Sequence, residues 1–87
     1  MTLPRISNYG KGKTKQHNTT VVTVGRLEIY FSYETPVAYW HDSTGLVVRE
    51  NDWGPTTGKH LNWIDGGTHS QRISGVDFEN QLAELTN

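Results

Sequence analysis

The segment 27–33, LEIYFSY, decides the fold. Its odd-numbered positions carry Leu, Ile, Phe and Tyr, whereas its even-numbered positions carry Glu, Tyr and Ser. This period of two, with one apolar side, predicts a β-strand that is buried on that side. Glu34, Thr35 and Pro36 follow, and we expect the strand to end there because proline lacks a backbone N–H and has a fixed φ.

Short strands are also predicted before and after this segment. The segment 19–24, TTVVTV, is β-branched throughout, and Gly25-Arg26 provides a tight turn. Residues 37–40 and 46–50 predict a third and a fourth strand, separated by the turn-forming sequence 42–45. Because the connections are short, we expect antiparallel pairing in a four-stranded β-meander.

The pattern becomes helical after residue 53. Leu61 and Ile64 share one face of a short predicted helix, which a threonine at its start would cap and Gly66 would end. The sequence 74–77, SGVD, resembles a capping box, and the apolar positions 78, 82 and 85 follow at helical spacing. The expected fold class is therefore α+β, a four-stranded antiparallel meander whose apolar face is covered by two short C-terminal helices.

The chain length of 87 residues fits one domain and excludes a two-domain, cofactor-burying enzyme. Residues 1–18 are rich in Gly, Lys, Asn, Ser and Gln, a composition that predicts a flexible or irregular basic arm. Residues 19–87 are then the single α+β domain. The absence of cysteine excludes a disulfide framework, Cys-ligated zinc and a thiol nucleophile.

The charge is unevenly distributed along the chain. Residues 1–27 hold five basic residues and no acidic one, and residues 28–87 hold three basic and nine acidic residues, so the two parts carry +5 and −6. An arm of this charge is expected to contact a polyanion weakly, and nucleic-acid binding stays an alternative. No apolar run is long enough to span a membrane, and the start of the chain lacks the apolar core of a secretory signal, so we expect an intracellular protein.

The segment 53–60, WGPTTGKH, places two glycines, two threonines and a lysine at a predicted helix start. Free N–H groups and the positive end of the helix dipole make such a start favourable for anions. The spacing is not that of a Walker loop, and an ordinary Gly-Pro turn with a threonine cap is the alternative. The candidate ligand-binding residues are Trp53, Thr56, Thr57, Gly58, Lys59 and His60, with Arg49 and Asn51 before them and Tyr39 from the third predicted strand.

In this hypothesis Thr56, Thr57, Lys59 and the backbone of Gly58 bind phosphate. Trp53 or Tyr39 stacks on a base, and Arg49 or Asn51 contacts a base edge or a second phosphate. Aromatic residues are 10% of the chain, more than one small core readily holds. The alternative is that helices or a second subunit cover both faces of the sheet and so bury the aromatic side chains.

Catalysis is not expected from this sequence. The four histidines lack HxH or HExxH spacing, so we expect no metal site, and no residue stands out as an activated nucleophile. We therefore predict a protein without catalytic residues and without a cofactor.

The segments 31–39 (FSYETPVAY), 47–62 (VVRENDWGPTTGKHLN) and 64–67 (IDGG) resemble a family of small proteins of tailed bacteriophages. The similarity covers a little under half of the chain and leaves out residues 1–18. It implies a phage accessory protein that acts in the host cytoplasm, a context in which counter-defence factors are frequent.

Two modes of counter-defence fit the residues. The first is an oligomer that binds and sequesters a phosphorylated nucleotide immune signal, which the WGPTTGKH segment favours. The second is a protein–protein inhibitor of a host defence nuclease, resembling an anti-CRISPR protein, which the acidic charge after residue 27 favours. A nucleic-acid-binding accessory protein is the third possibility.

Overall fold

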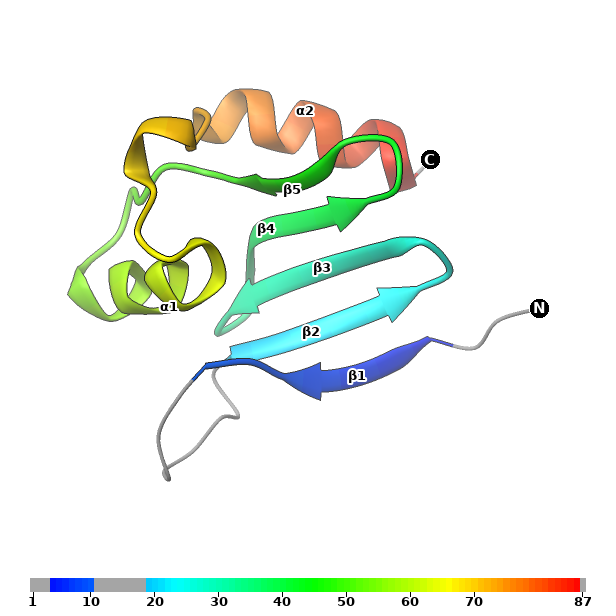
Figure 1. Ribbon diagram of the computed structural model, residues 1–87, viewed down its shortest axis with the longest axis horizontal. Helices are drawn as coiled ribbons and strands as arrows, with labels where there is room; N and C mark the ends of the chain where they lie inside the picture. Colours follow the sequence, from blue (N-terminus) through cyan, green and yellow to red (C-terminus); the bar gives the residue numbers. More distant parts are fainter. Residues whose placement is uncertain (1–3, 11–18, 87) are drawn as a thin grey trace.

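The structure, a computed structural model, describes residues 4–10 and 19–86 (Figure 1). Its sheet has five antiparallel strands in the order β1-β2-β3-β4-β5, so each strand pairs with its neighbours in the chain. The strands are β1 (Arg5–Asn8), β2 (Thr19–Val24), β3 (Leu27–Ser32), β4 (Thr35–His41) and β5 (Gly45–Val48). The α+β class and the antiparallel meander are confirmed, and the predicted number of four strands was one too few.

The additional strand, β1, lies inside the segment predicted to be an arm. It pairs with β2 from Arg5 opposite Thr23 to Asn8 opposite Thr20. Tyr9 anchors its end, because the Tyr9 amide donates to the Thr19 carbonyl at 3.1 Å and the Tyr9 hydroxyl donates to the Phe31 carbonyl at 2.8 Å. A polar composition predicts poor burial, but strand pairing needs only backbone groups. Residues 11–18, which contain all three lysines of the arm, lie outside the described residues.

The strand predicted as the third, at residues 37–40, is β4 of the structure. It begins earlier, at Thr35, and therefore includes Pro36. Pro36 lies opposite Phe31, where the pairing of β3 with β4 shifts register. A register shift of this kind interrupts the ladder, which is why a proline is tolerated there. Tyr33 makes the turn before it with a φ of +57°, the only positive value at a described non-glycine residue.

Helix α1 (Pro55–Asp65) starts at Gly54 and has Pro55 in its first turn, without a side-chain cap. The expected threonine cap was therefore wrong. The stop at Gly66 is confirmed by its left-handed φ of +70°, which glycine adopts without strain. A short 3-10 helix, η2 (His69–Gln71), leads to α2 (Gly75–Thr86). At the start of α2 the Asp77 amide donates to the Ser74 hydroxyl at 3.2 Å, as the capping box predicts.

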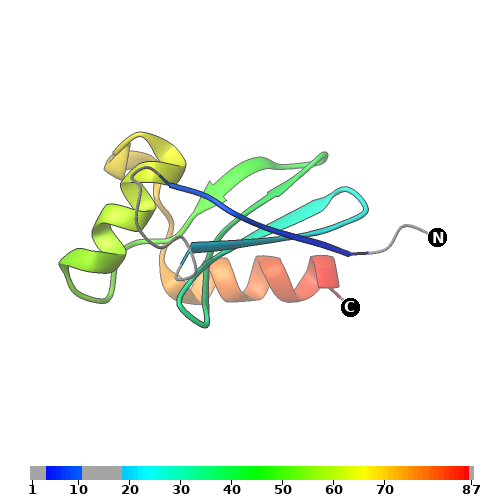
Figure 2. The same cartoon turned by 90° about the horizontal axis from the view of Figure 1, so that it is seen from below.

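Helix α2 runs along one face of the sheet, whereas α1 lies at one end of the strands (Figure 2) and contacts the other face through Leu61. Ala38 and Tyr39 are consecutive in β4 and therefore point to opposite faces. Ala38 packs in the cluster with Leu61 of α1, whereas the Tyr39 ring packs against Phe78 of α2 at 5.6 Å. The expectation of one covered, apolar face was thus too simple: Tyr30, on the supposed polar face, packs against the Leu61 cluster.

Candidate functional site

A polar cavity of about 360 Å³ lies between α1 and the chain on either side of η2. Three separate parts of the sequence form it: the end of β5, one side of α1 and the η2 segment. Its lining residues are Glu50, Asn51, Gly58, Asn62, His69 and Arg72. Asn51 and Gly58 belong to the predicted binding residues, and the other four were not predicted.

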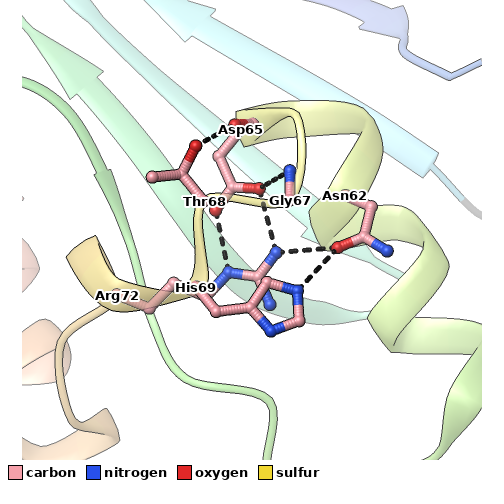
Figure 3. A network of polar contacts seen from close by, with 6 residues as sticks. All are labelled: Asn62, Asp65, Gly67, Thr68, His69 and Arg72. Atoms are coloured by element: carbon pink, nitrogen blue, oxygen red, sulfur yellow. Dashed lines mark hydrogen bonds and ion pairs between the residues drawn. The ribbon is translucent and has the colours of Figure 1, made fainter.

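Arg72 is the fixed cation of this cavity (Figure 3). Its guanidinium donates to both carboxylate oxygens of Asp65, from Nε at 2.8 Å and from Nη2 at 2.9 Å. The side chains are only 5% and 9% exposed, so the pair is shielded from water. The Arg72 hydrogen bonds hold the pKa of Asp65 below its ordinary value, and the Gly67 amide adds a further hydrogen bond at 2.9 Å.

Asn62 connects this ion pair to His69. Its Oδ1 accepts a hydrogen bond from Arg72 Nη2 at 3.0 Å and lies 3.3 Å from His69 Nε2. Because Oδ1 faces these two groups, the amide nitrogen of Asn62 points away from them, as Figure 3 shows. Within the described part of the chain this nitrogen donates no hydrogen bond, so Asn62, which lines the cavity, keeps a free donor group.

The predicted anion-binding segment is divided between two sides of α1. Thr57 and His60 are buried and turn toward the sheet. There the Ser32 hydroxyl lies 2.7 Å from His60 Nδ1 and 3.3 Å from the Thr57 hydroxyl. Burial lowers the pKa of His60, and the neighbouring charge of Lys59 adds to this effect.

Rings also surround His60. Trp63 stacks on it at 5.4 Å and Tyr33 lies at 5.7 Å. With these contacts Thr57 and His60 act in the packing of α1 on the sheet, and they are not available to an external phosphate.

Thr56 and Lys59 point to solvent. Neither of these two side chains forms an ion pair or side-chain hydrogen bond within the described part of the chain, and neither lines the polar cavity. The side chains of the WGPTTGKH segment therefore do not converge on one anion site within a single chain. Only Gly58 of this segment faces the cavity.

Arg49 was predicted to contact a ligand, but in the structure its side chain contacts other residues of the chain. Its buried guanidinium pairs with Asp52 at 3.1 Å and Glu79 at 3.4 Å and lies 4.7 Å from the Trp53 ring. Its Nε is buried and has no hydrogen-bond partner within residues 4–10 and 19–86. Arg49 thus joins the end of β5 to α2. Tyr39 is also unavailable, because it is fully buried and donates its hydroxyl to Gln81 at 2.8 Å.

Trp53 is 42% exposed and Tyr33 is 51% exposed. Both line a second hollow of about 80 Å³, together with Thr57 and Val37. This hollow is too small for a nucleotide, but two exposed rings at its rim form a surface suited to a protein side chain.

Comparison with known proteins places the chain in a family. A family model described as "Family of unknown function (DUF8033)" matches residues 1–80, and the chain belongs to this family. No curated protein and no solved structure matches the chain. Within the described residues, no helix is long and apolar enough to cross a membrane, and no three His, Asp or Glu side chains are grouped to hold a metal ion.

Proposed function

We propose that this protein binds a phosphorylated nucleotide without chemical conversion, and that the ligand occupies the polar cavity beside α1. The observation that carries the proposal is the fixed Arg72 guanidinium in a cavity large enough for a nucleoside-sized group. Arginine presents its donors in a planar arrangement that matches phosphate oxygens.

The neighbouring groups support the same chemistry. Asn62 has an amide donor directed away from Arg72. His69, which also lines the cavity, faces Asn62 with Nε2 and has its other ring nitrogen, Nδ1, for a ligand. Asp65 neutralises part of the charge of Arg72, so the site is suited to a ligand with both anionic and neutral polar groups. Lys59, one residue after Gly58 and free in solvent, is placed to add charge at the rim.

The resemblance to small tailed-phage proteins supports a biological setting for this binding. In the host cytoplasm a protein that captures a nucleotide immune signal needs affinity and abundance but no catalytic step. The proposed role is therefore counter-defence by sequestration.

A thermal-shift screen of the full chain tests the proposal. The probes are cyclic dinucleotides, ADP-ribose, mononucleotides and inorganic phosphate. At a hundredfold excess over its dissociation constant, a ligand adds about 2.7 kcal/mol to the free energy of unfolding. If none of the nucleotides raises the melting temperature, nucleotide capture is wrong.

Variants then locate the site. We expect His69→Ala and Lys59→Ala to weaken nucleotide binding with little loss of fold stability, because both side chains are exposed. The matched controls are His41→Ala and Arg26→Ala, which lie at the other end of the sheet and are expected to leave the affinity unchanged. Equal effects of the two sets on affinity would place the ligand elsewhere.

A protein–protein inhibitor of a host defence nuclease is the second candidate. The hollow between Tyr33 and Trp53 favours it, because exposed aromatic rings are frequent anchors of protein interfaces. Asp52 and Glu34, both exposed, flank these rings in the sequence and add the acidic character that a nuclease surface attracts. This candidate would be favoured if the unmodified chain bound no nucleotide but bound a host defence nuclease, and if Trp53→Ala lost the binding to that nuclease.

A further inference from the structure

We infer that two copies of this chain pair through the outer edges of their β1 strands, in an antiparallel arrangement centred on Ile6. The inference goes beyond ligand binding, because it concerns a surface on the other side of the molecule. It starts from the two edges of the sheet, which differ in how they are covered.

The β5 edge is covered by the chain itself at one end, where β5 finishes at Val48. Ile73 forms a parallel bridge with Arg49, its amide donates to the Val48 carbonyl at 2.9 Å, and its carbonyl accepts from the Glu50 amide at 2.7 Å. The β1 edge has no such cover among residues 4–10 and 19–86, since β1 is the terminal strand of the sheet there. All four residues of β1 are exposed.

The pairing of β1 with β2 determines which backbone groups face outward. The Tyr9 amide donates to Thr19, so Tyr9 and Thr19 form a hydrogen-bonded pair. Hydrogen-bonded and non-hydrogen-bonded pairs alternate in an antiparallel ladder. Ser7 and Arg5 therefore direct their N–H and C=O groups to β2, and Ile6 directs its own to the outer edge.

Among the residues that the structure describes, Ile6 is also the most exposed large apolar side chain, at 75%. It lies opposite Val22, which lies opposite Ile29, so an apolar row runs across β1, β2 and β3 and ends at the open edge. A partner strand that places an apolar side chain beside Ile6 would extend this row. Unprotected edges of this kind promote pairing with another chain.

A second copy of β1 provides such a partner. When two β1 strands meet with Ile6 opposite Ile6 of the other copy, each Ile6 amide donates to the other Ile6 carbonyl and the two side chains pack together. In this register Arg5 lies opposite Ser7 of the other copy, so no like charges face each other. Because this two-fold contact occupies the β1 edge of both copies, the pairing ends at a dimer and does not continue into a fibre.

The test measures mass against concentration by light scattering after size exclusion, using the full chain. We expect a monomer at low concentration and a dimer at high concentration, since the contact is small. Ile6→Pro removes the outward N–H but no hydrogen bond to β2, so this variant should be monomeric with an unchanged circular-dichroism spectrum. Ile6→Thr should weaken the dimer, whereas Val76→Thr, at a similarly exposed β-branched residue of α2, should leave it intact.

Hydrogen exchange on the unmodified chain provides a readout that does not depend on any variant. The Ile6 amide should gain protection as the concentration rises, whereas the Ser7 amide should be protected at every concentration. Three results would overturn the inference: a monomer up to millimolar concentration, a dimer that persists in Ile6→Pro, or an Ile6 amide protected equally in the monomer. The last result would mean that another part of the same chain covers the edge.

Discussion

Arg72 and Asp65 form a bidentate ion pair whose two partners line different cavities. Arg72 lines the polar cavity beside α1. Asp65 lines another cavity, of about 270 Å³ and distinct from the hollow at Tyr33 and Trp53, whose other walls include Leu46, Val48 and Ile64. The pair also ties the end of α1 to the segment after η2. It therefore holds one wall of each cavity in place and fixes the path of the chain between the helices.

Breaking this pair should cost considerable stability. In Asp65→Asn the buried guanidinium loses its counter-charge, and we expect the free energy of unfolding to fall by about 3 kcal/mol, as for other buried pairs. Urea unfolding followed by circular dichroism measures the change. The control is Asp42→Asn, which breaks the exposed Arg26–Asp42 pair at 3.2 Å and should cost less than about 1 kcal/mol. Equal losses in the two variants would contradict a buried structural role for Asp65.

His60 should make stability depend on pH below neutrality. Burial lowers its pKa in the folded protein below the unfolded value of 6.5, so the unfolded chain binds the proton more readily. Stability is fully present above pH 6.5 and falls as the pH drops from there toward the folded pKa. In His60→Asn this part of the dependence should vanish, and in His41→Asn it should stay. Chemical unfolding at a series of pH values measures this dependence, and a pH dependence that does not change between the unmodified chain and His60→Asn over this range would contradict it.

Gly75 should resist replacement although it lies in a helix. A Cβ at this position would overlap the Arg49 guanidinium and approach Asp52 Oδ2 to 3.3 Å. Alanine usually stabilises a helix relative to glycine, but here we expect Gly75→Ala to destabilise by about 1–3 kcal/mol, because Arg49 must move. Gly54→Ser is the control, since it has open space and offers a hydroxyl cap to α1. Thermal unfolding should show a loss for the first variant and no loss for the second.

A substitution at Gly58 should affect nucleotide binding without lowering the stability of the fold. A Cβ there would point toward the cavity, 3.0 Å from the side-chain nitrogen of Asn51, and it would improve the helix propensity of α1. We expect Gly58→Ala to keep or slightly raise the melting temperature while weakening nucleotide binding by narrowing the cavity. Calorimetric titration measures the affinity. An unchanged affinity would show that the ligand does not lie along this side of α1.

Most of the elements were predictable from local pattern. The alternation in residues 27–33, the β-branched run before it and the glycines at 25 and 66 indicated strands, a turn and a helix end that the structure confirms. The capping sequence at Ser74 likewise indicated the start of α2. These signals are local, because they depend on the spacing of apolar residues and on backbone conformations that few residue types adopt.

The binding residues were less predictable. Thr57 and Lys59 are two positions apart in one helix, and only the packing of α1 on Ser32 decided that the first is buried while the second faces solvent. Arg49 was expected at a ligand and instead joins β5 to α2 through Glu79, thirty residues later.

By itself the sequence determined the class of fold, the order of the main strands and helices after residue 19, the end of α1 at Gly66 and the start of α2 after Ser74, because each follows from the chemistry of neighbouring residues. Only the tertiary structure decided that β1 extends the sheet, that the helices contact opposite faces, and that Asn62, His69 and Arg72 meet at one cavity. These features depend on contacts between distant parts of the chain, for which single residues such as Tyr9 and Asp65 carry no local signal.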